Sequence, residues 1–190
     1  MTLEPIGSTV QTVEGPQQTA PPEIDWFAPP AYTSQWLNPY RKLTRQAFLA
    51  AQHAKAGYYV FRLKPNGKTP AFKGWQDEAT NDPARVAELW GTTPYNIGWA
   101  LWKSGHFAFD LDAKNGKDGI AEWRNLWNGQ APPKCLVNTT TTGGRHLIFK
   151  ADLPNSAGKL APGIDTRGTG GYVAAPGSVV DGKTYRLHPG

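Results

Sequence analysis

Two aspartates, Asp110 and Asp112, stand one residue apart at the end of the apolar segment FAFDLD, residues 107–112. On a β-strand, residues i and i+2 face the same side, so the two carboxylates would project together while Phe109 and Leu111 face away. Two unit charges about 4 Å apart repel by about 4 kcal/mol at an effective dielectric of roughly 20. This repulsion is a large part of the stability of a small domain, unless a cation or a proton removes it. The pair therefore predicts a divalent-metal site, although Asp-x-Asp also occurs in polymerases, glycosyltransferases and ordinary turns.

Two further stretches carry polar residues that suit an anionic ligand. In TTTTGGRHLIF, residues 139–149, a glycine pair precedes Arg145 and His146. Their side chains can donate hydrogen bonds to phosphate, and paired glycines let a bound group approach the backbone. In GIDTRGTGGYVAAPGS, residues 163–178, Asp165 lies two residues before Arg167 in a glycine-rich stretch interpreted as a turn. Each stretch is a weak signal alone, so the interpretation depends on their order after Asp-x-Asp.

The elements around these motifs indicate an α+β fold. Helical spacing and capping residues predict helices from Leu43 to Gly57, over 82–91 and over 118–127. Apolar runs bounded by turn residues predict strands at 58–63, 96–101, 106–112, 135–142, 145–150, 171–176 and 178–187, the last with a hairpin turn at Asp181 and Gly182. Because helices and strands mix without strict alternation, we expect a largely antiparallel or mixed sheet with flanking helices.

Composition limits the class of protein. A chain of 190 residues that is 39% hydrophobic can bury one principal core, and its formal charge of +5 suits a polyanionic partner. A single cysteine, Cys135, excludes an internal disulfide framework and a cysteine-based zinc site. The sequence has no signal-peptide pattern and no membrane-spanning stretch, so we expect a cytoplasmic protein that does not bind membranes. Residues 1–30 are predicted to form a disordered or extended tail, and residues 31–190 the folded domain.

Taken together, the motifs resemble the bifunctional primase-polymerase family of the archaeo-eukaryotic primase superfamily, found in replication proteins of phages and plasmids. The resemblance runs from about Gly57 to Arg186 and includes the upstream segments NGKTPAFKGWQ and NIGWAL. It implies an RRM-like catalytic core in which Asp110, Asp112 and Asp165 hold Mg²⁺ or Mn²⁺ and His146 contacts the incoming nucleotide. It also implies a DNA template and primer and dNTP or NTP substrates as partners, a helicase region in the same longer polypeptide, and the host cytoplasm if the protein is phage-encoded.

Several basic side chains are candidates for binding the triphosphate. We rank His146, Arg145 and Arg167 ahead of Lys68 and Lys73, which lie in RLKPNGKTPAFKGW and could equally bind template phosphates or form a solvated hairpin. Some relatives place serine two residues before the histidine, where this chain has Gly144. The hydroxyl of Thr142 is the candidate replacement.

The expected activity is metal-dependent nucleotidyl transfer onto a DNA-templated primer, in which a 3′-hydroxyl attacks the α-phosphorus and expels pyrophosphate. The alternative is a non-catalytic single-stranded DNA-binding module of a replication helicase, which would have no need of three aspartates. A nicking initiator generally needs a His-hydrophobe-His pair, and RHLIF supplies one histidine. A glycosyltransferase would leave the Arg-His motif without a role.

Overall fold

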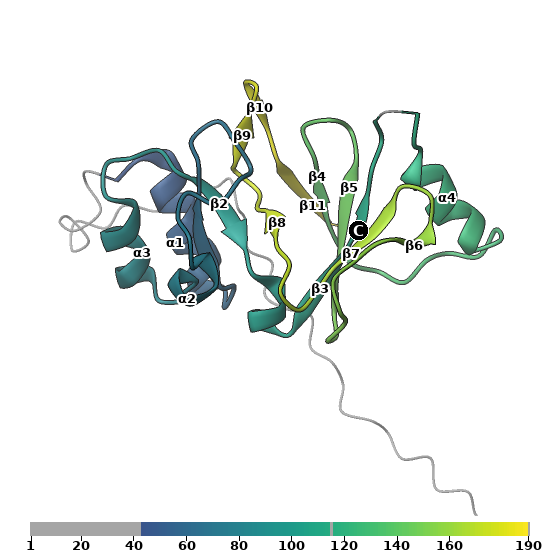
Figure 1. The fold of residues 1–190 in the computed structure, drawn as a ribbon, viewed down its shortest axis with the longest axis horizontal. Helices are drawn as coiled ribbons and strands as arrows, with labels where there is room; N and C mark the ends of the chain where they lie inside the picture. The colour runs from purple at the N-terminus through teal and green to yellow at the C-terminus, as the bar shows by residue number, and fades with distance from the viewer. Residues whose placement is uncertain (1–42, 115, 190) are drawn as a thin grey trace, which may run out of the picture. The chain divides into compact units, whose positions relative to one another are not determined.

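The computed structural model describes residues 43–114 and 116–189 of the chain (Figure 1), so the tail predicted for residues 1–30 lies outside the described residues. As expected, the described chain combines helices with antiparallel strands. The helices are α1 (Arg45–Lys55), α2 (Trp75–Glu78), α3 (Pro83–Trp90), a 3-10 helix (Leu101–Ser104) and α4 (Gly119–Leu126). The strands are β1 (Val60–Leu63), β2 (Asn96–Trp99), β3 (His106–Leu111), β4 (Leu136–Thr139), β5 (Arg145–Lys150), β6 (Ser156–Ala161), β7 (Ile164–Arg167), β8 (Val173–Ala174), β9 (Val179–Val180), β10 (Lys183–Thr184) and β11 (Arg186–Pro189).

The described strands form three sheets, whereas the sequence predicted one. A three-stranded sheet has the order β1-β2-β8, a two-stranded sheet pairs β10 with β9, and a six-stranded sheet has the order β11-β4-β5-β3-β7-β6. The chain changes sheets between β2 and β3. The segments predicted as strands at 96–101 and 106–112 are joined by the 3-10 helix, which ends at Ser104 and carries the chain from one sheet to the next.

Capping residues explain where the predicted helices begin. The Thr44 side chain accepts a hydrogen bond from the Ala47 N–H at 3.1 Å, and Asp82 accepts one from the Ala84 N–H at 2.9 Å. Buried alanines line one face of α1 and let it pack closely against α3. Gly57 follows α1 with a φ of 93°, a conformation that glycine adopts without strain.

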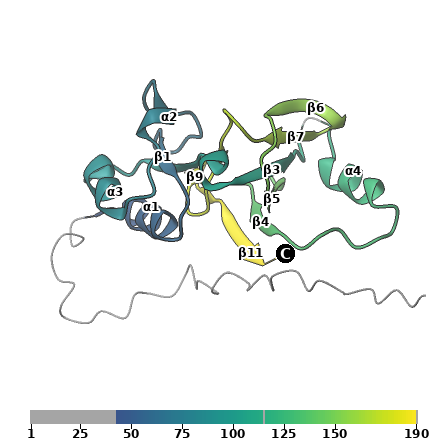
Figure 2. The same ribbon diagram turned by 90° about the horizontal axis from the view of Figure 1, so that it is seen from below.

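The three-stranded sheet is surrounded by α1, α2 and α3, which all contact β1 (Figure 2). Phe61 of β1 is completely buried and stacks on Trp75 of α2, with ring centroids 4.3 Å apart. Gly98 of β2 lies opposite Phe61, and a Cβ at that position would come within 2.3 Å of the ring. The glycine of NIGWAL is therefore a packing requirement of this sheet.

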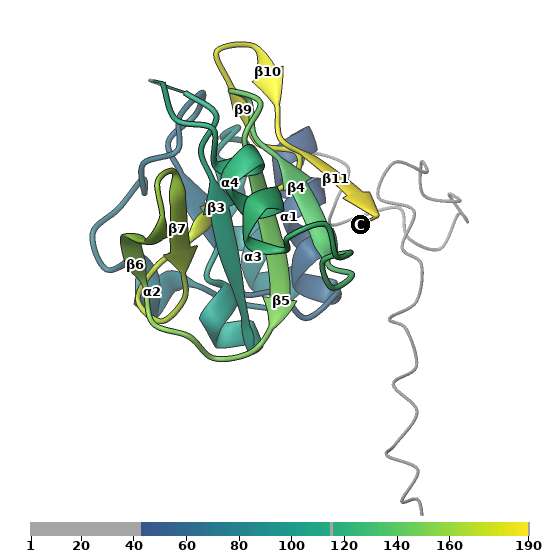
Figure 3. The same cartoon turned by 90° about the vertical axis from the view of Figure 1, so that its right-hand side faces the viewer.

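The six-stranded sheet is covered on one face by α4 (Figure 3). Trp123 of α4 belongs to one buried apolar cluster with Leu111, Leu147 and Ile164, which come from β3, β5 and β7. The sequence did not predict α2, β6 or β7. The prediction of a glycine-rich turn around Asp165 was wrong, because residues 164–167 form strand β7. This strand pairs with β3, which carries Asp110.

Within the described residues, no helix has the length and apolar character needed to cross a lipid bilayer.

Candidate active site

A row of four polar residues crosses the face of the six-stranded sheet that points away from α4. Antiparallel registers place Asn138 of β4 opposite His146 of β5, His146 opposite Asp110 of β3, and Asp110 opposite Asp165 of β7. Successive residues of a strand face opposite sides, which explains why Leu111, Leu147 and Ile164, each next to a residue of this row, lie in the apolar core beneath α4. The sheet thus brings together residues from three separate sequence motifs.

Basic side chains neutralise the carboxylates of this region. Arg167 Nε and Nη2 donate to Asp110 Oδ2 at 3.1 and 3.0 Å, and Nη2 also donates to Asp165 Oδ2 at 2.9 Å. The second oxygen of Asp165 accepts the Gly158 N–H at 2.7 Å. Asp112 follows the end of β3 and lies 3.2 Å from Lys114 Nζ. Each aspartate therefore has a cation of the chain beside it, which reduces the repulsion expected from their spacing.

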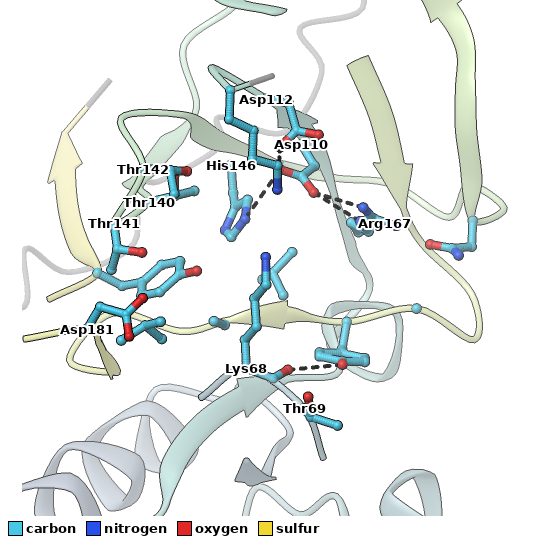
Figure 4. Close-up of a pocket in the computed structure, with 18 of the residues that line it drawn as sticks. Lys68, Thr69, Asp110, Asp112, Thr140, Thr141, Thr142, His146, Arg167 and Asp181 are labelled. Carbon is cyan, nitrogen blue, oxygen red and sulfur yellow. Dashed lines mark hydrogen bonds and ion pairs between the residues drawn. The ribbon is translucent and has the colours of Figure 1, made fainter. Parts of the chain in front are cut away.

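A cavity of about 570 Å³ opens beside the row. Its acidic lining comes from Asp110, Asp112 and Asp181. The side chain of Lys68 points toward Asp110 and His146 from the loop after β1 (Figure 4). Backbone contacts fix this loop: the Asn96 side chain donates to Gly67 O at 2.8 Å, and the Tyr172 hydroxyl donates to Lys68 O at 3.0 Å. The cavity therefore combines carboxylates with cations contributed by different parts of the fold.

The structure brings most of the predicted site residues to the cavity. Its lining includes six of them: Asp110, Asp112, His146, Arg167, Thr142 and Lys68. The other three, Arg145, Lys73 and Asp165, are not lining residues. Arg145 precedes His146 on β5 and therefore faces the other side, Lys73 is exposed, and Asp165 contacts Arg167 instead. The roles of all nine residues stay predictions.

Sequence reasoning missed several polar residues at this site. Asn138 lies in the row, and the lining also includes Thr140, Thr141, Tyr185 and Asp181. The run of four threonines before the glycine pair was a visible signal for the hydroxyls. Asn138 had no comparable signal because its place beside His146 depends on the register between β4 and β5.

His146 is the most buried of the predicted site residues, with 6% of its surface exposed. Burial lowers the pKa of its imidazole, Asp110 opposes this effect, and Arg167 and Lys68 add to the decrease. The ring of Tyr185 lies 6.0 Å away and is inclined by only 24°. A neutral imidazole in this position offers one donor and one acceptor nitrogen.

The carboxylates have the donor chemistry that Mg²⁺ and Mn²⁺ prefer, because hard divalent cations bind oxygen ligands. However, among residues 43–114 and 116–189 no group of three His, Cys, Asp or Glu side chains is arranged to hold a metal ion. Arg167 lies between Asp110 and Asp165 and bonds to both. Asp110 and Asp112 carry the oxygen donors that a hard cation binds, but Asp110 and Asp165 would be available to it only if Arg167 moved to another anion.

Carboxylates and basic side chains that share one cavity are typical of enzymes that transfer phosphate-containing groups. Residues 50–190 match the family described as bifunctional DNA primase/polymerase, N-terminal. This match spans more than half of the 190 residues, and the chain belongs to that family. The resemblance predicted from the motifs is thereby confirmed, and with it a DNA primase/polymerase type of nucleotidyl transfer. No curated protein sequence matches the chain.

Proposed function

We propose that this chain is the catalytic module of a phage or plasmid replication protein and adds nucleotides to a DNA-templated primer, with DNA polymerase and primase activity. In this proposal the substrates are dNTPs or NTPs, and a helicase region belongs to the same longer polypeptide. One observation carries the proposal: Asp110 and Asp112 line a single cavity together with His146, Arg167 and Lys68. The triphosphate needs such cations, and the reaction needs carboxylates beside them.

Three aspartates are the proposed metal ligands: Asp110, Asp112 and Asp165. A bound Mg²⁺ or Mn²⁺ supplies Lewis-acid chemistry, which lowers the pKa of the primer hydroxyl and offsets charge on the leaving pyrophosphate. Within the cavity, His146, Arg167 and Lys68 are proposed to hold the triphosphate, with the Thr142 hydroxyl as a further donor. Arg145 and Lys73 lie outside the cavity lining and are available to DNA phosphates.

One observation favours the alternative of a non-catalytic single-stranded DNA-binding module. Arg167 already occupies Asp110 and Asp165, so these carboxylates are satisfied without a metal ion. In a binding module the arginine would stay in place and the row would only stabilise the sheet. In the polymerase, Arg167 would release the carboxylates when an anionic substrate enters.

Primer extension distinguishes the two functions. The protein is incubated with a labelled dNTP, a primed template and Mn²⁺, in parallel with the variants Asp110→Asn and Asp77→Asn. We expect Asp110→Asn to lower extension by about 100-fold or more, because it removes a charge from the reacting centre. Asp77 is exposed on α2, and its variant is the matched control. Retention of DNA without extension would support the binding module, and shortening of the primer a nuclease.

A further inference from the structure

Each nitrogen of the His146 ring has one polar neighbour within the row. Nδ1 lies 3.0 Å from Asn138 Nδ2, and Nε2 lies 3.5 Å from Asp110 Oδ1. Asn138 is completely buried. The protonation of the two nitrogens must therefore be compatible with an amide on one side and a carboxylate on the other.

The orientation of the Asn138 amide follows from a second contact. The same atom that approaches His146 also lies 2.8 Å from the carbonyl oxygen of Ala174. A carbonyl oxygen only accepts hydrogen bonds, and an amide oxygen at this position would be repelled by it. The atom is therefore the NH₂ nitrogen, which uses one hydrogen for Ala174 and the other for Nδ1 of His146.

This orientation determines where the ring proton lies. Because Nδ1 accepts a hydrogen bond, a neutral imidazole carries its proton on Nε2. The carboxylate of Asp110 beside Nε2 is an acceptor and agrees with this assignment. Within the described residues, Asn138 Oδ1 has no hydrogen-bond partner. A buried amide oxygen without a partner costs free energy of folding, which an apolar side chain of similar shape would not cost. The favourable contribution of Asn138 therefore comes from the two hydrogen bonds that its NH₂ group donates.

We propose that Asn138 is a positioning residue that holds His146 in the tautomer protonated at Nε2, so that His146 presents an N–H donor to a phosphate group of the substrate. The identity of the substrate rests on the proposed function, whereas the tautomer rests on the contacts of the row. Tyr185 assists by stacking on the ring, which limits rotation of the imidazole plane. Asn138 itself does not line the cavity and acts only through His146.

The tautomer can be measured directly in the full chain labelled with ¹⁵N-histidine. Two-bond proton–nitrogen correlation spectra distinguish a ring protonated at Nε2 from one protonated at Nδ1. The chain supplies both references: His53 Nε2 lies 2.9 Å from Pro176 O, and His106 Nδ1 lies 2.7 Å from Ser104 O. Each carbonyl requires the proton on the nitrogen that it contacts. Single His→Gln variants assign the signals.

We expect His146 to give the same pattern as His53. A pattern like that of His106 would overturn the inference. The variant Asn138→Asp tests whether residue 138 sets the tautomer of His146. A carboxylate at this position accepts hydrogen bonds and should favour a proton on Nδ1. Its matched control is Asn155→Asp, which adds the same charge at the cavity and should leave the His146 pattern unchanged. If Asn138→Asp keeps the proton on Nε2 alone, Asn138 does not position the ring; if this variant does not fold, the wild-type spectrum still decides.

Nucleotide binding separates this inference from the proposed function. In dATP titrations we expect Asn138→Asp to bind about ten-fold more weakly than Asn155→Asp, the loss of about one hydrogen bond. Equal affinity in the two variants would overturn the role of Asn138 toward substrate. If wild-type protein binds no dATP but the spectrum of His146 still has the same pattern as that of His53, the proposed function is wrong and the inference about the ring tautomer is still supported.

Discussion

Acidification should destabilise this protein through His53, a histidine of α1 that lies outside the candidate site. The side chain is 1% exposed, its Nε2 is 2.9 Å from Pro176 O, and its ring packs edge-on against Trp99 with centroids 4.9 Å apart. Burial lowers the pKa of His53 from 6.5 to about 4, and the bond to Pro176 only partly opposes this. The folded protein therefore keeps this imidazole neutral where the unfolded chain would protonate it.

The sign and size of the effect follow from these two pKa values. Because the folded pKa is the lower one, the stabilisation is present above pH 6.5 and is lost as the pH falls toward about 4. The full difference corresponds to about 3 kcal/mol in the free energy of unfolding. Between about pH 7.5 and about pH 5, a range in which most carboxylates stay ionised, the loss is about 2 kcal/mol.

Urea unfolding at the two pH values measures this loss. We compare wild type with His53→Gln, whose amide can still donate to Pro176 O and does not titrate. Wild type should lose about 2 kcal/mol more than the variant, because contributions of the other histidines cancel in the comparison. His188→Gln, at an exposed position of β11, is the control and should lose as much as wild type. Equal losses in wild type and His53→Gln would show that His53 does not cause the destabilisation by acid.

Two predictions concern the candidate site. A Cβ on Gly144 would lie 2.4 Å from Leu111 O, so Gly144→Ser should lower the free energy of unfolding by about 1–3 kcal/mol. Gly143→Ala is the control, because its Cβ would meet nothing within 4 Å and only the φ of +90° would be strained. If urea unfolding shows a smaller loss for Gly144→Ser than for Gly143→Ala, the predicted clash at Gly144 is wrong. In melting experiments, Asp112→Asn should leave the metal-free melting temperature nearly unchanged, because it relieves repulsion with Asp110 but also removes the ion pair with Lys114. It should reduce the stabilisation by added Mn²⁺. An unchanged response to Mn²⁺ would argue against Asp112 as a ligand.

Elements that depend on local signals could be predicted from the amino-acid sequence. Asp82 followed by Pro83 predicted the start of α3, because a capping side chain bonds within its own first turn. The helix predicted over 118–127 is α4, and in the structure the Asp118 side chain caps its first turn. The glycine pair between β4 and β5 and the Asp181–Gly182 turn between β9 and β10 predicted connections that the structure confirms. The order of the three motifs was also enough to predict the family.

Which of the motif residues lie side by side depends on long-range strand pairing. β7 is a four-residue strand flanked by glycines, and its pairing with β3 depends on backbone partners more than 50 residues away in sequence. That register puts Asp165 opposite Asp110 and allows Arg167 to bridge them, and the register of β4 with β5 puts Asn138 beside His146. Local composition carries no information about such partners, because any pair of strands with apolar faces can pair and only the packed core selects one register.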